Sequence, residues 1–194
     1  MNLVGSGVAV FLGSQRGTDP GYLQAASDLG RLLAEAGAAV VYGGAAIGCM
    51  GALADGALAA GGQVIGVMPT RLVEREIAHR GLSEHHEVAT MHARKAKMFA
   101  CSKAFVALPG GWGTLDELCE VVTWRQLGMH QWPIVLIDLG GYWKPLLEQL
   151  ERAVGAGLMA PGVAQLVHVV DGAPACVGYL LGLAEPPPPA GSWG

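Results

Sequence analysis

Residues 109–117, Pro-Gly-Gly-Trp-Gly-Thr-Leu-Asp-Glu, have the composition of a turn that binds phosphate. They follow an apolar run at Ala104–Leu108 that predicts a buried parallel strand, and they lead into a helical pattern. In such a turn the glycines let the backbone approach an anion, and the first N–H groups of the helix donate to it. The turn is neither a Walker A loop, which would continue with Gly-Lys-Ser/Thr, nor a GxGxxG fingerprint. We therefore predict a phosphate held by Gly110, Gly111, Gly113 and Thr114.

Glu117 places a carboxylate one turn into the predicted helix, close to where the anion would bind. In one interpretation Thr114 caps the helix and Glu117 reaches back to the N–H of the cap, the arrangement known as a capping box. In the other, the carboxylate does chemistry on the bound ligand. The segment by itself favours the capping box, because such boxes are common at helix starts.

Arg94, Lys95 and Lys97 lie on a second predicted helix, just before the apolar run. Arg94 and Lys97 share one face of this helix, because they are three residues apart. A cluster of this kind is usually a solvated basic face. Its position ahead of the glycine turn offers another interpretation, in which the cluster and the carboxylate belong to one site.

Together, Arg94-Lys95 and the turn at 109–117 resemble the paired motif of the "lonely guy" (LOG) family. The members of that family are cytokinin riboside 5′-monophosphate phosphoribohydrolases and are often mislabelled lysine decarboxylases. The separation of Arg94 from Glu117 also fits the family. The resemblance extends from Val8 to about Leu183, with further family-like segments at Gly13-Ser14, Tyr42–Gly51, Arg75–Ile77, Glu120–Gly128 and Gly141-Tyr142.

The chain departs from the family pattern at a few positions. Ala45 stands where a third glycine is usual, Cys49 where a leucine is usual, and Arg125 where a small residue is usual. The extra methyl group of Ala45 lies in a turn near the ligand, where it could narrow the pocket or shift the loop. We expect these differences to affect substrate preference more than chemistry, because Arg94 and Glu117 are intact.

The resemblance implies hydrolysis of the N-glycosidic bond of an N6-substituted adenosine 5′-monophosphate, which releases a free cytokinin base and ribose 5-phosphate with no cofactor. An ionised Glu117 would stabilise positive charge on the ribose and orient or deprotonate the attacking water. Arg94 would orient the nucleotide and favour departure of the base. Which of the two residues handles the water and which the leaving group stays open at this point. The resemblance further implies a homodimer or higher homo-oligomer, and substrate contacts at Ser14, Glu76, Lys95, Gly110, Gly111, Gly113, Thr114 and Thr123.

Two other functions stay open at this point. The chain could hydrolyse plain AMP or another nucleotide without any role in cytokinin metabolism. It could also be a non-catalytic nucleotide-binding module of the same fold, such as a sensor or a carrier. Arg94 and Glu117 weigh against simple binding, because binding alone has no need of a carboxylate beside a phosphate.

The composition argues against several classes of protein. With 194 residues and a net charge of −4, the chain has neither the basic surface of a nucleic-acid-binding protein nor a polybasic membrane patch. Its four cysteines are far apart and form no CxxC pair, which indicates free thiols in the cytoplasm. Its six histidines form no HxxxH pair, so we expect no metal site. An uncharged stretch at 36–54 contains five glycines and predicts a strand and a helix, not a membrane span.

Apolar runs alternate with helical patterns along the chain, and continuous apolar runs are typical of parallel strands buried on both faces. We predict an α/β fold, a single Rossmann-like doubly wound parallel sheet with helices on both faces, over residues 1–184. A Pro-rich tail at 185–194 is predicted to be disordered or polyproline-like. The predicted strands are Val8–Leu12, Ala39–Tyr42, Val64–Met68, Ala104–Leu108, Ile134–Asp138 and Leu166–Val170. The predicted helices are Tyr22–Ala36, Cys49–Ala60, Met91–Cys101, Thr114–Leu127, Trp143–Val154 and Ala173–Leu183.

The predicted helix Thr114–Leu127 is apolar over a wide arc. It has two apolar stripes about a quarter-turn apart, made of Leu115, Leu118 and Val122 and of Val121, Trp124 and Leu127. A helix of this kind lies either at the centre of a core or at a subunit interface. The interface agrees with the dimers that the family resemblance implies.

Overall fold

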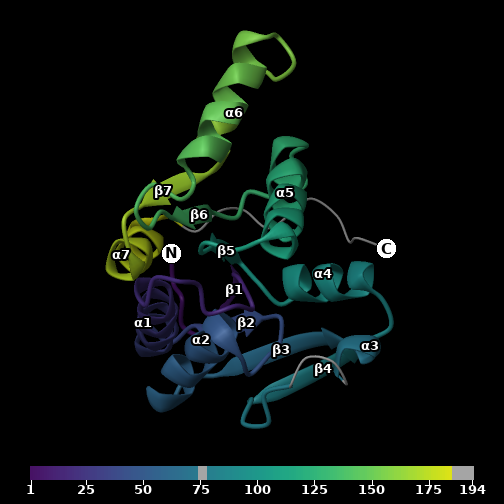
Figure 1. Cartoon of the computed structure of the whole chain (residues 1–194), viewed down its shortest axis with the longest axis vertical. Coiled ribbons are helices and arrows are strands. Elements are labelled where there is room, and N and C mark those ends of the chain that lie inside the picture. The colour runs from purple at the N-terminus through teal and green to yellow at the C-terminus, as the bar shows by residue number, and fades with distance from the viewer. Residues whose placement is uncertain (74–77, 185–194) are drawn as a thin grey trace.

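The computed structural model describes residues 1–73 and 78–184, and in this part of the chain the strands form one seven-stranded sheet (Figure 1). The strand order is β4-β3-β2-β1-β5-β6-β7, and every neighbouring pair is parallel. From β1 the chain adds β2, β3 and β4 on one side, and it then returns to add β5, β6 and β7 on the other side of β1. The strand order therefore reverses between β1 and β5. The strands are β1 Gly7–Phe11, β2 Ala39–Tyr42, β3 Val64–Pro69, β4 Glu84–Val88, β5 Ala104–Ala107, β6 Ile134–Ile137 and β7 His168–Val170.

Helices connect the strands and cover both faces of the sheet, which confirms the predicted fold class. The uncharged stretch at 36–54 contributes β2 and the start of α2, as predicted. Within the described residues, no helix is both long and apolar enough to cross a membrane. The helices are α1 Gly21–Glu35, α2 Gly48–Ala59, α3 Thr70–Val73, α4 Met91–Ala100, α5 Trp112–Gln126, α6 Lys144–Gly155, α7 Ala173–Gly182 and the 3₁₀ helix η1 Val163–Leu166.

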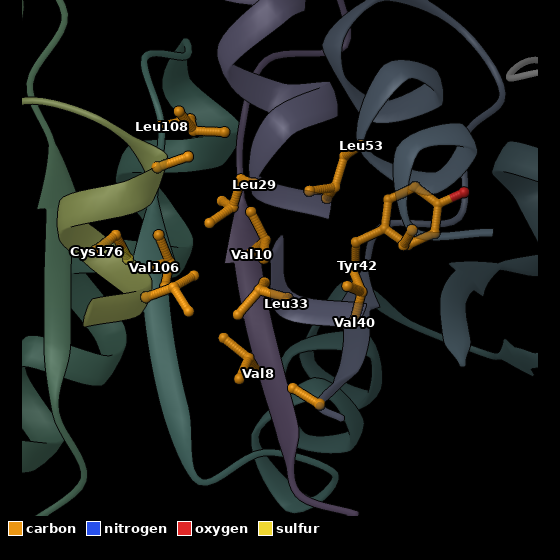
Figure 2. Close-up of a cluster of buried hydrophobic side chains, with 14 of the residues drawn as sticks. Val8, Val10, Leu29, Leu33, Val40, Tyr42, Leu53, Val106, Leu108 and Cys176 are labelled. Carbon is orange, nitrogen blue, oxygen red and sulfur yellow. The ribbon is translucent and has the colours of Figure 1, made fainter. Parts of the chain in front are cut away.

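One core lies between the sheet and helices α1, α2 and α7. Alternate side chains of the strands, such as Val8 and Val10, point into it. Figure 2 shows them packed against Leu29 of α1, Leu53 of α2 and Cys176 of α7. Burial of each large apolar side chain contributes roughly 1.5–3 kcal/mol, so this face fixes β1, β2 and β5 firmly in the sheet.

A second core lies on the opposite face, under α4 and α5. Phe11 of β1 points into it, between Met98 of α4 and Leu118 of α5. Trp143, just before α6, is 1% exposed and belongs to the same core. This core holds α4 and α5 side by side against the sheet, and both helices carry residues predicted to be catalytic.

Several elements differ from the sequence-based expectation, and the short helices α3 and η1 were not predicted. β4 reads Glu-His-His-Glu-Val and was not predicted, because it is a polar edge strand and lacks an apolar run. α5 begins at Trp112 and not at Thr114. β7 is shorter than predicted, because Leu166 belongs to η1. The predicted tail at 185–194 lies outside the described residues, and so does Glu76.

Helix α6 projects away from the body of the molecule (Figure 1). None of its residues is buried, although several of its leucines are half-buried. The apolar side of the helix is therefore only partly covered within the described chain.

Candidate active site

A pocket of about 560 Å³ opens at the carboxyl ends of β1 and β5, where the strand order reverses. This is the place where doubly wound sheets bind their ligands, because the loops diverge there and leave a crevice. The loops after both strands line it, together with α4, α5 and the start of α2. The residues predicted to contact substrate that line the pocket are Ser14, Arg94, Gly110, Gly111, Gly113, Thr114 and Glu117.

The glycine turn after β5 touches the loop after β1. A Cβ atom on Gly110 would lie 2.0 Å from Oγ1 of Thr114 and 2.8 Å from the backbone N of Gly13. The N–H of Gly13 also donates to the carbonyl of Pro109, with an N···O distance of 3.3 Å. Only glycine fits at position 110, and its small size lets the two loops pack together as one continuous floor of the pocket.

Helix α5 begins directly after this turn, with Gly111 as its N-cap residue. Gly111 has no side chain with which to cap the first N–H groups. Thr114 is consequently the third residue of the helix, and the capping-box interpretation of Glu117 is wrong. The N-terminal end of α5 keeps the N–H groups and the partial positive charge that suit a phosphate.

Arg94 and Glu117 form a buried pair at the base of the pocket. Nη1 of Arg94 lies 3.4 Å from Oε1 of Glu117, and the two residues are 6% and 5% exposed. The Nε–H of Arg94 donates to the carbonyl of Val67 over 3.0 Å, so the guanidinium is fixed in place. The interpretation of Arg94 as part of a solvated basic face is therefore wrong.

Two local features place the guanidinium. Thr90 caps α4, since its hydroxyl oxygen accepts the N–H of Ala93 at 3.0 Å, and this sets Arg94 in the first turn. A Cβ atom on Gly43 would lie 2.0 Å from Nη2 of Arg94. Gly43 therefore makes room for the arginine, a role that the sequence analysis did not identify. The signal was the Gly-Gly pair at the end of the second strand.

Burial raises the pKa of Glu117 to about 7, against an ordinary value of 4.5. The nearby charge of Arg94 opposes this shift, while the negative charge of Asp116 adds to it. The carboxyl group therefore exchanges its proton near neutral pH, which is the range in which a general base or an electrostatic stabiliser can act.

Lys95 and Thr123 lie elsewhere in the described chain. Nζ of Lys95 is 3.0 Å from Oδ1 of Asp116 and 3.3 Å from Oε1 of Glu120, in ion pairs that connect α4 to α5. The exposed Thr123 donates its hydroxyl to the carbonyl of Cys119 over 2.7 Å. Within the described residues of a single chain, neither Lys95 nor Thr123 lines the pocket.

Apolar and aromatic side chains complete the pocket, and the sequence analysis did not assign them to it. The half-buried Met50 and the exposed Met91 form an apolar wall suited to a base or its substituent. Tyr142 approaches from the start of α6, and its hydroxyl donates to the carbonyl of Gly110 over 2.5 Å. Among the described residues, no group of three or more His, Cys, Asp or Glu side chains is arranged to hold a metal ion.

Comparisons with known proteins find close similarity in sequence to a group of hydrolases. The model of a family described as "Possible lysine decarboxylase" matches residues 50–180. The chain is 44% identical over 174 residues to the cytokinin riboside 5′-monophosphate phosphoribohydrolase of Rhodococcoides fascians, and the match covers 88% of each chain. It is 42% identical over 160 residues to cytokinin riboside 5′-monophosphate phosphoribohydrolase LOG7 of Arabidopsis thaliana, which covers 82% of this chain and 74% of that one.

Among solved structures, the molybdenum cofactor binding protein of the phototrophic bacterium Rippkaea orientalis is similar, with a TM-score of 0.68 and 22% identity. The superposition covers 91% of this chain and 95% of that one. At this level of identity the likeness shows a shared fold and nothing about the ligand.

Proposed function

Because the chain belongs to the LOG family, whose model carries the lysine decarboxylase description, we propose that it is a cytokinin riboside 5′-monophosphate phosphoribohydrolase. It hydrolyses the N-glycosidic bond of an N6-substituted adenosine 5′-monophosphate and releases the cytokinin base and ribose 5-phosphate. The observation that carries the proposal is the buried Arg94–Glu117 pair at the base of a pocket next to a glycine turn.

The 5′-phosphate binds at the start of α5. Gly110, Gly111 and Gly113 let the backbone approach its oxygens, and the first helical N–H groups donate to them. Glu117 follows Thr114 by three residues, about 4.5 Å along the helix axis. A ribose attached to this phosphate would therefore bring C1′ close to the carboxylate.

Glu117 and Arg94 have different roles in the hydrolysis. As the bond from C1′ to the base breaks, its electron pair moves to the base nitrogen and positive charge grows on the ribose. The ionised carboxylate of Glu117 stabilises that charge and orients or deprotonates the water that attacks C1′. Arg94 orients the nucleotide and stabilises the negative charge on the departing base. The base takes up a proton from solvent as it leaves, and the proton of the attacking water passes through Glu117 to solvent, so the reaction balances.

The partly covered apolar side of α6 and two exposed leucines near it support a homodimer or a higher homo-oligomer. Leu127, at the end of α5, is 68% exposed, and Leu158, just beyond α6, is 86% exposed. Exposed leucines beside a projecting amphipathic helix favour a partner surface of the same kind. We propose that a second copy of the chain covers α6 and the end of α5.

We also propose that the enzyme works in the cytoplasm. All four cysteines lie in the described part of the chain and are free thiols. Cys49 lines the pocket, where oxidation would add bulk next to the substrate, so a reducing compartment suits this site.

The test compares N6-isopentenyl-AMP with plain AMP, using chromatography that separates base from nucleotide. The proposal expects release of isopentenyladenine and ribose 5-phosphate by the wild-type protein and none by Glu117→Gln. Faster release of adenine from AMP would instead make the protein a general nucleotide nucleosidase. Tight binding of both nucleotides without release of either base would make it a carrier.

A further inference from the structure

The loop between β6 and α6 is anchored so that it presents one tyrosine to the glycine turn. The N–H of Trp143 donates to Oδ1 of Asp138 at 2.9 Å, and its indole Nε1–H donates to the carbonyl of Ile137 at 3.1 Å. Gly140 and Gly141 have φ values of +63° and +80°, which L side chains rarely adopt. The buried Trp143 and the two glycines together fix the position of Tyr142.

Tyr142 reaches across the pocket rim to a residue 32 positions earlier in the chain. Its hydroxyl donates to the carbonyl oxygen of Gly110 over 2.5 Å. Its ring meets the ring of Tyr22 edge-on at a centroid distance of 6.4 Å and that of Trp143 at 5.2 Å. The contacts with Gly110 and Tyr22 come from the turn after β5 and from α1, so the side chain connects its own loop to two other parts of the pocket rim.

The hydrogen bond holds a peptide group that is otherwise easy to turn over. In a planar trans peptide, the carbonyl of Gly110 and the N–H of Gly111 point in opposite directions. Rotating this peptide changes ψ of Gly110 and φ of Gly111, and glycine tolerates either sign of φ. A rotated peptide would exchange the donor for the acceptor and place a partial negative charge where a partial positive one lies now.

We infer that Tyr142 is a positioning residue for the hydrolysis, because it holds the Gly110–Gly111 peptide in the orientation that binds phosphate. The inference rests on the proposed function, in which this turn binds the 5′-phosphate. Tyr142 acts through the backbone of the turn, so its loss weakens recognition of phosphate and leaves the pair of Arg94 and Glu117 in place.

The first experiment uses Tyr142→Phe in the full chain, which keeps the ring and removes only the hydroxyl. The Kd of ribose 5-phosphate and the KM of N6-isopentenyl-AMP should rise about fivefold, while kcat changes by less than about twofold. Binding of N6-isopentenyladenosine, which lacks the phosphate, should not change. Equal binding of ribose 5-phosphate by both proteins would overturn the inference. A wild type without binding or turnover would refute the proposed function instead.

A second substitution separates this role from direct contact between Tyr142 and phosphate. Gly111 has a φ of −94°, and a Cβ atom placed on it meets nothing within 4 Å, so alanine fits the present conformation. Alanine resists the positive φ of a rotated peptide. Tyr142→Phe should therefore cost less binding of ribose 5-phosphate in the Gly111→Ala background than in the wild type. An equal cost in both backgrounds would mean a direct contact and would overturn the inference.

Discussion

Glu117 is almost completely withdrawn from water, and the Arg94 guanidinium 3.4 Å away compensates only part of the cost. Burial keeps the pKa of the carboxyl near 7, above its ordinary value of 4.5. Between these two values the folded protein binds more protons at this site than the unfolded chain does. The contribution of Glu117 to the free energy of unfolding therefore decreases as pH rises from about 4.5 to about 7, by about 3 kcal/mol in total.

Glu117→Gln should separate stability from activity. The amide resembles the neutral acid, so the free energy of unfolding of the variant relative to wild type should increase by about 2–3 kcal/mol between about pH 5 and about pH 8.5. Turnover should be lost at both values, as measured with N6-isopentenyl-AMP. Asp116→Asn removes an exposed carboxylate one residue away and should remain active. Near wild-type turnover in Glu117→Gln would remove the residue from the mechanism.

The same pKa predicts the pH dependence of catalysis. If the ionised carboxylate is the reactive form, kcat/KM should rise with pH and level off above about pH 7. The negative charge of Asp116 helps to raise the pKa of Glu117, so Asp116→Asn should move the midpoint of this rise to lower pH. Initial rates from about pH 5.5 to about pH 9 test both points. A rate that falls over this range would make protonated Glu117 the active form.

Arg94 should tolerate replacement less well than its neighbour Lys95. Arg94→Lys cannot donate to both the carbonyl of Val67 and the carboxylate of Glu117, because lysine lacks the planar fork of donors. We expect a loss of at least about 100-fold in kcat for Arg94→Lys and for Arg94→Ala. Lys95→Ala removes the ion pairs that connect α4 to α5 beside the site and leaves Arg94 and Glu117 in place, so it should act mainly on KM. Equal, mild losses at both positions would contradict the catalytic assignment of Arg94.

At the scale of elements, the turn between β5 and α5 gives a matched pair of substitutions. Gly110→Ala places a methyl group on Oγ1 of Thr114 and should destabilise the empty protein, by about 1–3 kcal/mol. Gly111→Ala meets no atom within 4 Å and should keep its stability. Its methyl group lies beside the proposed phosphate, so binding of ribose 5-phosphate should weaken. Urea unfolding and calorimetric titration check the two effects, and equal stability of both variants would contradict the packing argument.

Elements with an apolar run and a glycine stop were predictable, and elements without these signals were not. β5 and α5 are close to their predicted bounds, because burial on both faces leaves a clear pattern in the sequence. The edge strand β4 has a polar sequence that joins the sheet mainly through its backbone, and no apolar pattern in the sequence reveals such pairing. Likewise, local sequence could place Arg94 and Glu117 on helices but could not show that they meet.

The roles of Gly43 and Tyr142 in the site could not be predicted from the sequence. Gly43 matters because a guanidinium from a distant helix occupies the space of its missing side chain. Tyr142 matters because the loop after the neighbouring strand β6 bends over the glycine turn that follows β5. Both depend on long-range packing, which residue types and spacing within one segment do not encode.

At the scale of the whole molecule, the apolar arc of α5 divides into a buried part and an exposed end. Val121 is 4% exposed and belongs to the core under the sheet, so a charge there would unfold the chain and would not report on an interface. The half-buried Trp124 packs edge-on against Phe99 with ring centroids 4.9 Å apart. The exposed end of the helix at Leu127 is the part left for a partner.

The protein should accordingly be a dimer or larger, and Leu127→Glu or Leu158→Glu should split it. Both leucines are mainly exposed in the single chain, so a charge costs little folding free energy but would be buried without a counter-ion in the oligomer. Val4→Glu, on the 71% exposed residue before β1, is the control and should leave the assembly intact. Activity should fall with dissociation, because α6 begins two residues after Tyr142 and loses its cover. Light scattering that finds a fully active wild-type monomer at micromolar concentration would refute the assembly.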